Sequence, residues 1–247
     1  METAVRYQFD FSIIHVKLPD LLAGAITTLE VSILAIVFGF LLGLSLAFLR
    51  ATRITALKWL VAPYVELIRN TPFLVQLFVV YFVLPYAGIK IDPFPAGVIA
   101  LSLNCGGYAA EIIRAGIESI HEGQIDAGRA LGMKYLQVFR YVIFKPAMAT
   151  MFPALSSLFI TLMLGSSILS AISTPELTSV AYNITAYYYR HFEVFFFISG
   201  VYLAFSLVFS LVFRYIEVRF LRDEGPRTPT AILAYILTDT LVEKAQI

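Results

Sequence analysis

Long apolar runs alternate with short polar segments along this chain. Four of the runs contain no Asp, Glu, Lys or Arg: residues 31–49, 94–110, 147–171 and 194–213. A fifth run, residues 57–85, is long enough to cross a membrane but is interrupted by Glu66, Arg69 and Pro72. Because a transmembrane helix needs about 20 mostly apolar residues, the pattern predicts an all-α membrane protein with about five spanning helices.

Composition agrees with a membrane protein. Apolar residues make up 59% of the chain and charged residues 14%, with a mean hydropathy of +0.81. Soluble domains are about half apolar and about a quarter charged. The net charge of +1 gives no indication of nucleic-acid binding. The single cysteine, Cys105, excludes an internal disulfide and a CxxC site, and its apolar surroundings predict a packing role.

Basic residues gather in alternate loops, and short cytoplasmic loops retain Lys and Arg. One side has many of them: Arg50, Arg53, Lys58, Arg129, Lys134, Arg140, Lys145, Arg214, Arg219, Arg222 and Arg227. The other side has few: Arg6, Lys17, Lys90 and Arg190. With an odd number of spans, this asymmetry predicts an external N-terminus and a cytoplasmic C-terminus.

The chain divides into three parts without a detectable internal repeat. Residues 1–20 are predicted to form an external lead-in, residues 21–222 the transmembrane domain, and residues 223–247 a cytoplasmic tail. Within the tail, residues 231–242 are apolar over about a dozen positions, too few to span. An interfacial helix, a contact with a partner and a mobile segment all remain open for it.

The first span contains Gly39 and Gly43, a GxxxG pair that favours close packing with another helix of the same chain. Before this span, Thr27, Thr28 and Glu30 suit either the lining of a polar path or the membrane interface, and the interface is favoured.

The second span carries polar residues at membrane depth. Proline disfavours a helical residue before it, so Thr71 is predicted to be a break. Glu66 and Arg69 stand three apart, which suits either a salt bridge within the helix or a place beside a translocation path. Thr71 and Gln76 are further candidates for residues of such a path.

A polar block, residues 111–146, separates two apolar runs. Residues 123–131 are predicted to form a short helix that ends at Gly132, with Ala127, Ala130 and Leu131 on one face. A second amphipathic helix is predicted over residues 134–142, ending before Pro146. Because a few residues would connect two spans, this long ordered segment favours a docking surface over a simple connection.

Particular residues of this block resemble a known family. Asp126, Ala127, Gly128 and Gly132, followed by VIFKP at residues 142–146, resemble the EAA loop of importer-type ATP-binding cassette (ABC) permeases. The segments GGYAAEIIRAGIESIHEGQIDAGRALGM and RNTPFLVQLFVVYF are similar to the polar amino-acid uptake permeases, which include histidine, glutamine, glutamate and arginine importers. With TPEL at 174–177 and HFEV at 191–194, the resemblance covers roughly residues 23–221.

The resemblance implies a type I importer fold in a bacterial inner membrane, with a cytoplasmic coupling helix inside residues 115–146. It implies partners too: a second permease subunit, two cytoplasmic ATPases and an external solute-binding protein. ATP and Mg²⁺ would bind the ATPases, because this chain has no GxxxxGK[ST] loop and is not itself an enzyme. The residues expected to couple to the ATPase are Gly123, Asp126, Ala127, Gly128, Ala130, Leu131 and Gly132.

Two departures from the family pattern stand out. Asp126 replaces the usual Glu, and Lys145 stands where the family has proline, which suggests a weakened or partner-specific docking loop.

In relatives, the fourth span carries a Lys-Asp-Thr-Ser cluster that is implied to line the amino-acid site. Here the matching residues, 164–167, carry no charge, which leaves Thr161, Ser166 and Ser167 as candidates. Since burying an unpaired substrate charge is costly, a heterodimer or an amino-acid derivative as substrate is expected.

Other classes fit less well. An ion-coupled secondary transporter would show repeated halves and more than one interrupted helix. A channel subunit would leave the polar block unexplained. His15, His121 and His191 have no metal-ligand spacing, so neither a metal site nor a membrane enzyme is expected.

Overall fold

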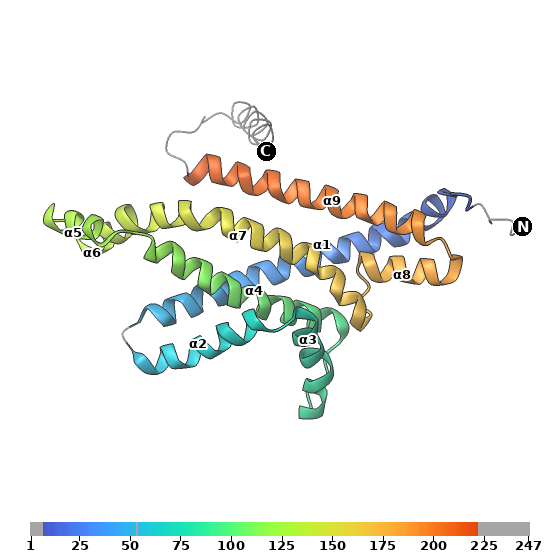
Figure 1. Ribbon diagram of the computed structural model, residues 1–247, viewed down its shortest axis with the longest axis horizontal. Helices are drawn as coiled ribbons and strands as arrows, with labels where there is room; N and C mark the ends of the chain where they lie inside the picture. The colour runs from blue at the N-terminus through green and yellow to red at the C-terminus, as the bar shows by residue number, and fades with distance from the viewer. Residues whose placement is uncertain (1–6, 53, 222–247) are drawn as a thin grey trace, which may run out of the picture.

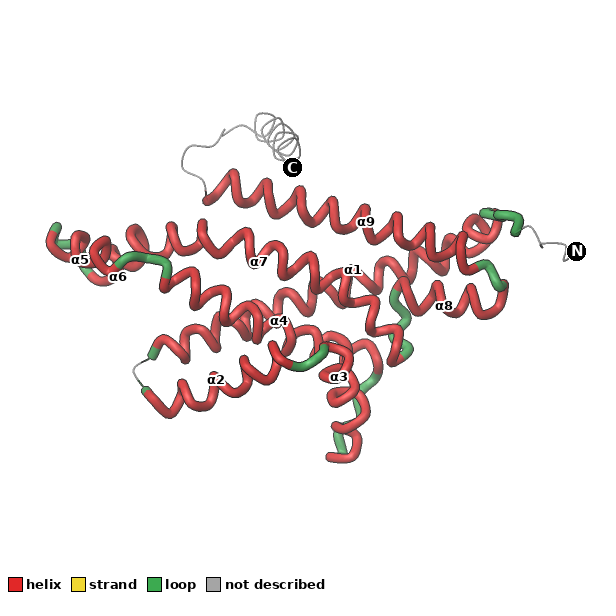
Figure 2. The backbone as a smooth tube through the Cα atoms, viewed as in Figure 1, coloured by secondary structure: helices red, strands yellow, loops and turns green. Residues whose placement is uncertain are grey.

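The protein is described by a computed structural model over residues 7–52 and 54–221, and those residues fold almost entirely into helices joined by short loops (Figures 1 and 2). Four helical stretches are long and apolar enough to span a membrane: Ser12–Ala51, Pro93–Glu118, Tyr135–Ile172 and His191–Leu221. A fifth span is possible if the bent pair Thr55–Asn70 and Phe73–Ala87 counts as one. The prediction of an all-α membrane protein with about five spans is confirmed.

The interrupted second span is a sharp bend. Helix α2 (Thr55–Asn70) ends at Thr71, whose backbone is extended, and Pro72 begins α3 (Phe73–Phe78). The helix axis bends by 113° between the two arms. After α3 the chain continues through a π-helical segment, η1 (Val79–Val83), and a 3₁₀ turn, η2 (Leu84–Ala87), and ends at Gly88 with a positive φ of 85°. The predicted break at Thr71 is therefore confirmed.

Helices α1 (Ser12–Ala51) and α4 (Pro93–Glu118) pack closely through glycine. A Cβ atom placed on Gly39 would lie 2.5 Å from the Cβ of Cys105, and one on Gly43 would lie 2.6 Å from the Cβ of Ala109. Cys105 is fully buried. The predicted packing roles of the GxxxG pair and of Cys105 are both confirmed.

Helix α8 (Leu177–Tyr188) packs against the N-terminal half of α1, and no helix was predicted there. The contact depends on Thr28, whose Oγ1 accepts a hydrogen bond from the Leu177 N–H at 3.1 Å and donates one to the Gly24 carbonyl. Thr28 is fully buried, so its polar side chain serves helix packing, while Glu30 is exposed. Their place at the membrane interface stays a prediction.

The helix that follows the polar block does not stop before Pro146. Helix α6 (Tyr135–Gln137) passes through the π-helical η3 (Val138–Phe144) into α7 (Lys145–Gly165) and the 3₁₀ turn η4 (Ser166–Ile172). The predicted end before Pro146 is wrong. Proline is tolerated in the first turn of α7, and the π-helical turns before it change the hydrogen-bond register without ending the helix.

The last spanning helix is α9 (His191–Ile216), extended by the π-helical η5 (Glu217–Leu221). It runs from the end of the molecule where α8 lies toward the opposite end, where α5 and α6 lie (Figure 1). These two ends are called the α8 end and the α5 end below. Helix begins at Ser12, inside the predicted lead-in. The predicted tail, residues 223–247, and its apolar segment 231–242 lie outside the described residues.

A Gly39→Ala variant should test the contact between α1 and α4. Overpacking a tight contact costs about 1–3 kcal/mol, so the thermal unfolding midpoint of the purified chain in detergent should fall. The matched control is Gly200→Ala in α9, where no atom lies within 4 Å of the added Cβ, and its midpoint should not fall. Equal midpoints for the two variants would contradict the packing role.

Candidate functional site

A short helix stands apart from the spans at one extreme end of the molecule (Figure 1). This is α5 (Glu122–Ala130), within one residue of the helix predicted over 123–131. The Nδ1 atom of His121 accepts a hydrogen bond from the Gly123 N–H at 3.0 Å and caps the helix start. Gly132 follows the helix with a φ of 75°, a left-handed conformation that favours glycine. The predicted terminator is confirmed.

Helix α5 is anchored through one small residue. Gly128 is buried, and a Cβ atom placed on it would lie 3.4 Å from Val142 and 3.5 Å from Val138, both in η3. The opposite side of the helix is open: Asp126, Ala127, Ala130 and Leu131 are exposed, Leu131 by 83%. Asp126 pairs with Arg129 at 3.2 Å on this surface. The face at 127, 130 and 131 is thus an apolar surface that nothing in the described chain covers.

A charged cluster links three helices between α5 and the centre of the bundle. Glu111 of α4 accepts hydrogen bonds from Arg50 of α1 at 2.9 Å and from Arg114 of its own helix. Arg69 of α2 lies 4.0 Å from the same carboxylate. Sequence reasoning missed Glu111 as the centre, because only its spacing to Arg114 is visible in one helix.

The salt bridge considered between Glu66 and Arg69 is not formed in the described structure. Arg69 is oriented toward Glu111, while Glu66 accepts a hydrogen bond from Asn70 at 3.0 Å. Both residues are exposed on the surface of α2. Glu66 therefore lies on the open surface of α2, while Arg69 belongs to the charged cluster around Glu111.

At the bend between α2 and α3, Gln76 closes the gap in backbone hydrogen bonding. Its Nε2 donates to the Ile68 carbonyl at 2.8 Å and to the Thr71 carbonyl at 3.1 Å. Its Oε1 accepts from the side chain of Asn104 in α4 at 3.0 Å. The broken helix is thus fixed to α4 by an amide pair, and sequence reasoning missed Asn104.

Beside this amide pair lies a cavity of about 400 Å³. Its wall is mostly apolar and is formed by Tyr64, Leu67, Ile68, Thr71, Val75, Gln76, Val79, Val80, Ala100 and Leu103. Two predicted path residues, Thr71 and Gln76, therefore line the same cavity. The Gln76 amide and the Thr71 hydroxyl are engaged by backbone carbonyls and by Asn104, so the wall is an apolar surface that suits a ligand part without formal charge.

The three candidates in and after α7 are not part of that cavity. Ser166 is buried and donates to the Met163 carbonyl at 2.6 Å, and Ser167 donates to the Leu164 carbonyl at 2.9 Å. Thr161 is exposed on α7. Among the described residues, no hydrogen bond joins any of the three to Gln76 or Thr71. Both serine hydroxyls therefore serve the backbone, which was the simpler interpretation of this stretch.

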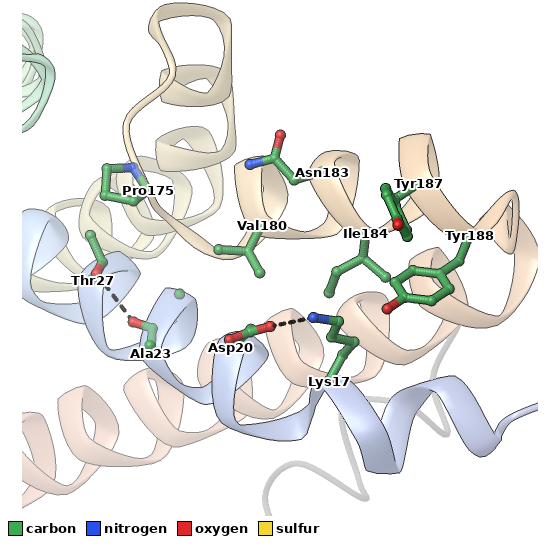
Figure 3. A pocket seen from close by; sticks show the side chains of 11 residues that line it. Lys17, Asp20, Ala23, Thr27, Pro175, Val180, Asn183, Ile184, Tyr187 and Tyr188 are labelled. Carbon is green, nitrogen blue, oxygen red and sulfur yellow. Dashed lines mark hydrogen bonds and ion pairs between the residues drawn. The ribbon is translucent and has the colours of Figure 1, made fainter.

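A larger cavity of about 650 Å³ opens at the α8 end, between α1 and α8 (Figure 3). Lys17 and Asp20 form an ion pair at 3.1 Å along its wall, and the Lys17 ammonium lies 5.8 Å from the ring centroid of Tyr188. Tyr187 and Asn183 complete the side formed by α8. Sequence reasoning missed this cavity because its two walls, residues 17–27 and 175–188, are far apart in the chain.

Close to the same end, a buried carboxylate holds the first described residues against α9. Glu193 accepts from the Tyr7 hydroxyl at 2.5 Å, from the Asp10 N–H at 3.0 Å and from Arg190 at 3.3 Å. Hydrogen bonds from Ser12 hold the pKa of Asp10 below its usual range. The hydrogen bond with Tyr7 raises the pKa of Arg190. These hydrogen bonds join the first described residues to the start of α9.

Comparison with known proteins gives consistent matches. Residues 39–222 match the family described as binding-protein-dependent transport system inner membrane component. The chain is 37% identical over 196 residues to the probable glutamine ABC transporter permease protein GlnM of Bacillus subtilis, covering 79% of this chain and 91% of that protein. It is 41% identical over 168 residues to the L-cystine transport system permease protein TcyB of the same species, covering 68% and 72%. A crystal structure of an amino acid ABC transporter with histidines is similar with a TM-score of 0.80 at 38% identity, covering 87% of this chain and 100% of that chain.

A Gln76→Ala variant should loosen the bend between α2 and α3. It leaves the carbonyls of Ile68 and Thr71 and the amide of Asn104 without this partner, which costs about 1–3 kcal/mol. Thermal unfolding in detergent should show a lower midpoint than for Gln124→Ala, which removes the same side chain from the exposed surface of α5. If the two variants unfold together, the amide does not hold the bend.

Proposed function

The chain belongs to the family of binding-protein-dependent transport system inner membrane components, and we propose that it is the permease subunit of an ABC importer for polar amino acids or close derivatives. The relatives named for glutamine and cystine, and the structural neighbour that is an amino acid transporter, support this substrate class. In the transporter the chain carries the substrate across a bacterial inner membrane.

The observation that carries the proposal is the position and attachment of α5. The helix is exposed beyond the spans, and its buried Gly128 rests on η3. Because η3 belongs to one continuous helical stretch, Tyr135–Ile172 of 38 residues, a displacement of α5 passes directly into a spanning helix. An ATPase that binds the exposed face of α5 would therefore move the spanning helix, with α5 acting as a rigid lever.

The ATPase contact would use the residues of α5 and its end: Gly123, Asp126, Ala127, Gly128, Ala130, Leu131 and Gly132. Gly128 and Gly132 shape the helix, and the exposed residues meet the partner. Asp126 would meet it as one half of an ion pair with Arg129, so the shorter acidic side chain reaches the partner less far than Glu. ATP and Mg²⁺ bind the two ATPase subunits, where hydrolysis takes place.

The α5 end faces the cytoplasm in this proposal, and the N-terminus lies outside. The basic residues of the loop between α1 and α2 and of α5 to α7 support this orientation. The cavity between α1 and α8 then faces an external solute-binding protein. Its Lys17–Asp20 pair and tyrosines offer partners for both charges of an amino acid released there.

Within the span, Thr71 and Gln76 line the path, and the exposed Glu66, Arg69 and Thr161 face the second permease subunit. Ser166 and Ser167 act in helix packing. Two features of this stretch support a heterodimer. The hydroxyls of Ser166 and Ser167 are engaged with backbone carbonyls, and residues 164–167 include no charged side chain to pair with a substrate carboxylate or ammonium. The other permease subunit would supply these charged contacts.

The test is ATP-driven uptake of labelled amino acids into proteoliposomes that contain this chain, its co-encoded ATPase, the binding protein and the second permease. Uptake that requires internal ATP is expected, and uptake without ATP would reject an ABC importer. Omitting the second permease should abolish uptake. Uptake that persists would reject the heterodimer and leave the importer class intact.

A Gly132→Asp variant should insert normally into the membrane and lose coupled uptake. The side chain is strained at a φ of 75° and adds charge where the ATPase binds. A loss of about 1.4 kcal/mol in docking free energy lowers occupancy of the docked state about tenfold when docking is weak.

The matched control is Gly88→Asp, which has a similar φ of 85°, with no atom within 4 Å of the added Cβ, and lies after η2. It imposes the same kind of backbone strain away from α5 and should retain uptake. Equal losses in the two variants would assign the effect to backbone strain and exclude the docking surface.

A further inference from the structure

A third cavity, of about 250 Å³, lies where the ends of α1, α4 and the start of α2 meet. Its wall is formed by Ala47, Arg50, Ala51, Lys58, Arg114, Ile117 and Glu118. The ends of α1, α2 and α4 that form this wall lie toward the end of the molecule that α5 occupies (Figure 1). The transport function proposed above uses none of its charged residues.

The cavity and the charged cluster beside it carry an excess of positive charge. The cations are Arg50, Lys58, Arg69 and Arg114, and the anions are Glu111 and Glu118, which gives a sum of +2. Glu111 holds the guanidinium groups of Arg50 and Arg114 in place from two helices, and Glu118 pairs with Arg114, so the donors left for a ligand are those of Arg50 and Lys58. Lys58 is exposed and forms no ion pair with any described residue. Fixed guanidinium groups match the oxygens of a phosphate group in geometry and charge.

Exposed apolar side chains that are near neighbours in the sequence of the cavity residues Ala47 and Lys58 indicate the depth of these helix ends in the membrane. Phe48, Trp59 and Leu60 are exposed by 72%, 76% and 71% and belong to the same ends of α1 and α2. Trp is enriched at the boundary between hydrocarbon and headgroups. The cavity is smaller than the roughly 300–1,000 Å³ that enclose a drug-sized ligand, so only a small group enters it.

We propose that this cavity binds the phosphate group of an anionic phospholipid, with the acyl chains against Phe48, Trp59 and Leu60. Basic pockets between spanning helices on the cytoplasmic side are suited to such headgroups, since anionic lipids gather in that leaflet. The bound lipid joins the ends of α1, α2 and α4 through one phosphate. The proposal rests on the membrane orientation proposed above and does not depend on the substrate of the chain or on ATP.

The single tryptophan of the chain provides a local probe, because Trp59 is the residue next to Lys58. The full-length chain is reconstituted into phosphatidylcholine vesicles that contain either tail-brominated phosphatidylglycerol or tail-brominated phosphatidylcholine at equal mole fraction. Quenching of Trp59 by the anionic lipid should exceed quenching by the zwitterionic lipid. Equal quenching would overturn the proposal.

Two variants with opposite charge changes sharpen the test. Lys58→Gln should lower the relative affinity for the anionic lipid about fivefold, which corresponds to about 1 kcal/mol for one basic residue near the surface. Glu118→Gln removes an anion and should raise the preference. The matched control Lys134→Gln removes an exposed lysine at the same end of the molecule, outside the cavity, and should leave the preference unchanged.

An unchanged preference in Lys58→Gln, or an equal loss in Lys134→Gln, would assign the effect to general surface charge and overturn the site. Inorganic phosphate is added in a separate arm, against chloride at equal ionic strength. If phosphate removes the preference, a soluble anion occupies the cavity and the lipid assignment is wrong.

Discussion

The close contact between α1 and α4 determines where every other helix can lie. Inside a membrane, lipid is as apolar as a leucine side chain, so helices associate through tight packing and hydrogen bonds. Helix α4 places a glycine at each of three further contacts. Ile68 of α2 packs against Gly107, Met151 of α7 against Gly116, and Leu169 of η4 against Gly97. It is the central helix of the bundle, and its small residues bring three neighbours within contact distance.

Such a tightly packed bundle tolerates broken helices only where polar groups find partners. No described buried side-chain nitrogen or oxygen lacks a hydrogen-bond partner. Glu176 illustrates this: its carboxylate accepts from the Thr178 and Ser179 N–H groups at 2.8 and 2.7 Å and from the Tyr202 hydroxyl at 2.9 Å. Glu176 thus accepts from free N–H groups at the start of α8, and Gln76 donates to free carbonyls at the end of α2. The irregular segments are therefore fixed in place, which a defined path between them requires.

Features encoded in adjacent residues were predictable from the sequence, and features that depend on distant partners were not. Apolar length indicated the spans, Pro72 the break at Thr71, and Gly132 the end of α5. The packing role of Thr28 was missed because its partner, Leu177, is 149 residues away. Glu111 was missed because two of its three arginines belong to other helices. Pro146 predicted a helix end because local rules do not register the π-helical turns before it. The same limit concealed Asn104 and the cavity between α1 and α8.

The length of α1 gives the bundle an uneven geometry. At 40 residues it measures about 60 Å, twice the hydrocarbon thickness of about 30 Å. Its tight contact with α4 at Gly39 and Gly43 is far from its middle: roughly 40 Å of helix extends toward the α8 end and roughly 12 Å toward the α5 end. If α1 rocks on this contact as a rigid rod, its tip at the α8 end sweeps about three times as far as its tip at the α5 end. A slight adjustment at the α5 end then becomes a wide displacement at the α8 end.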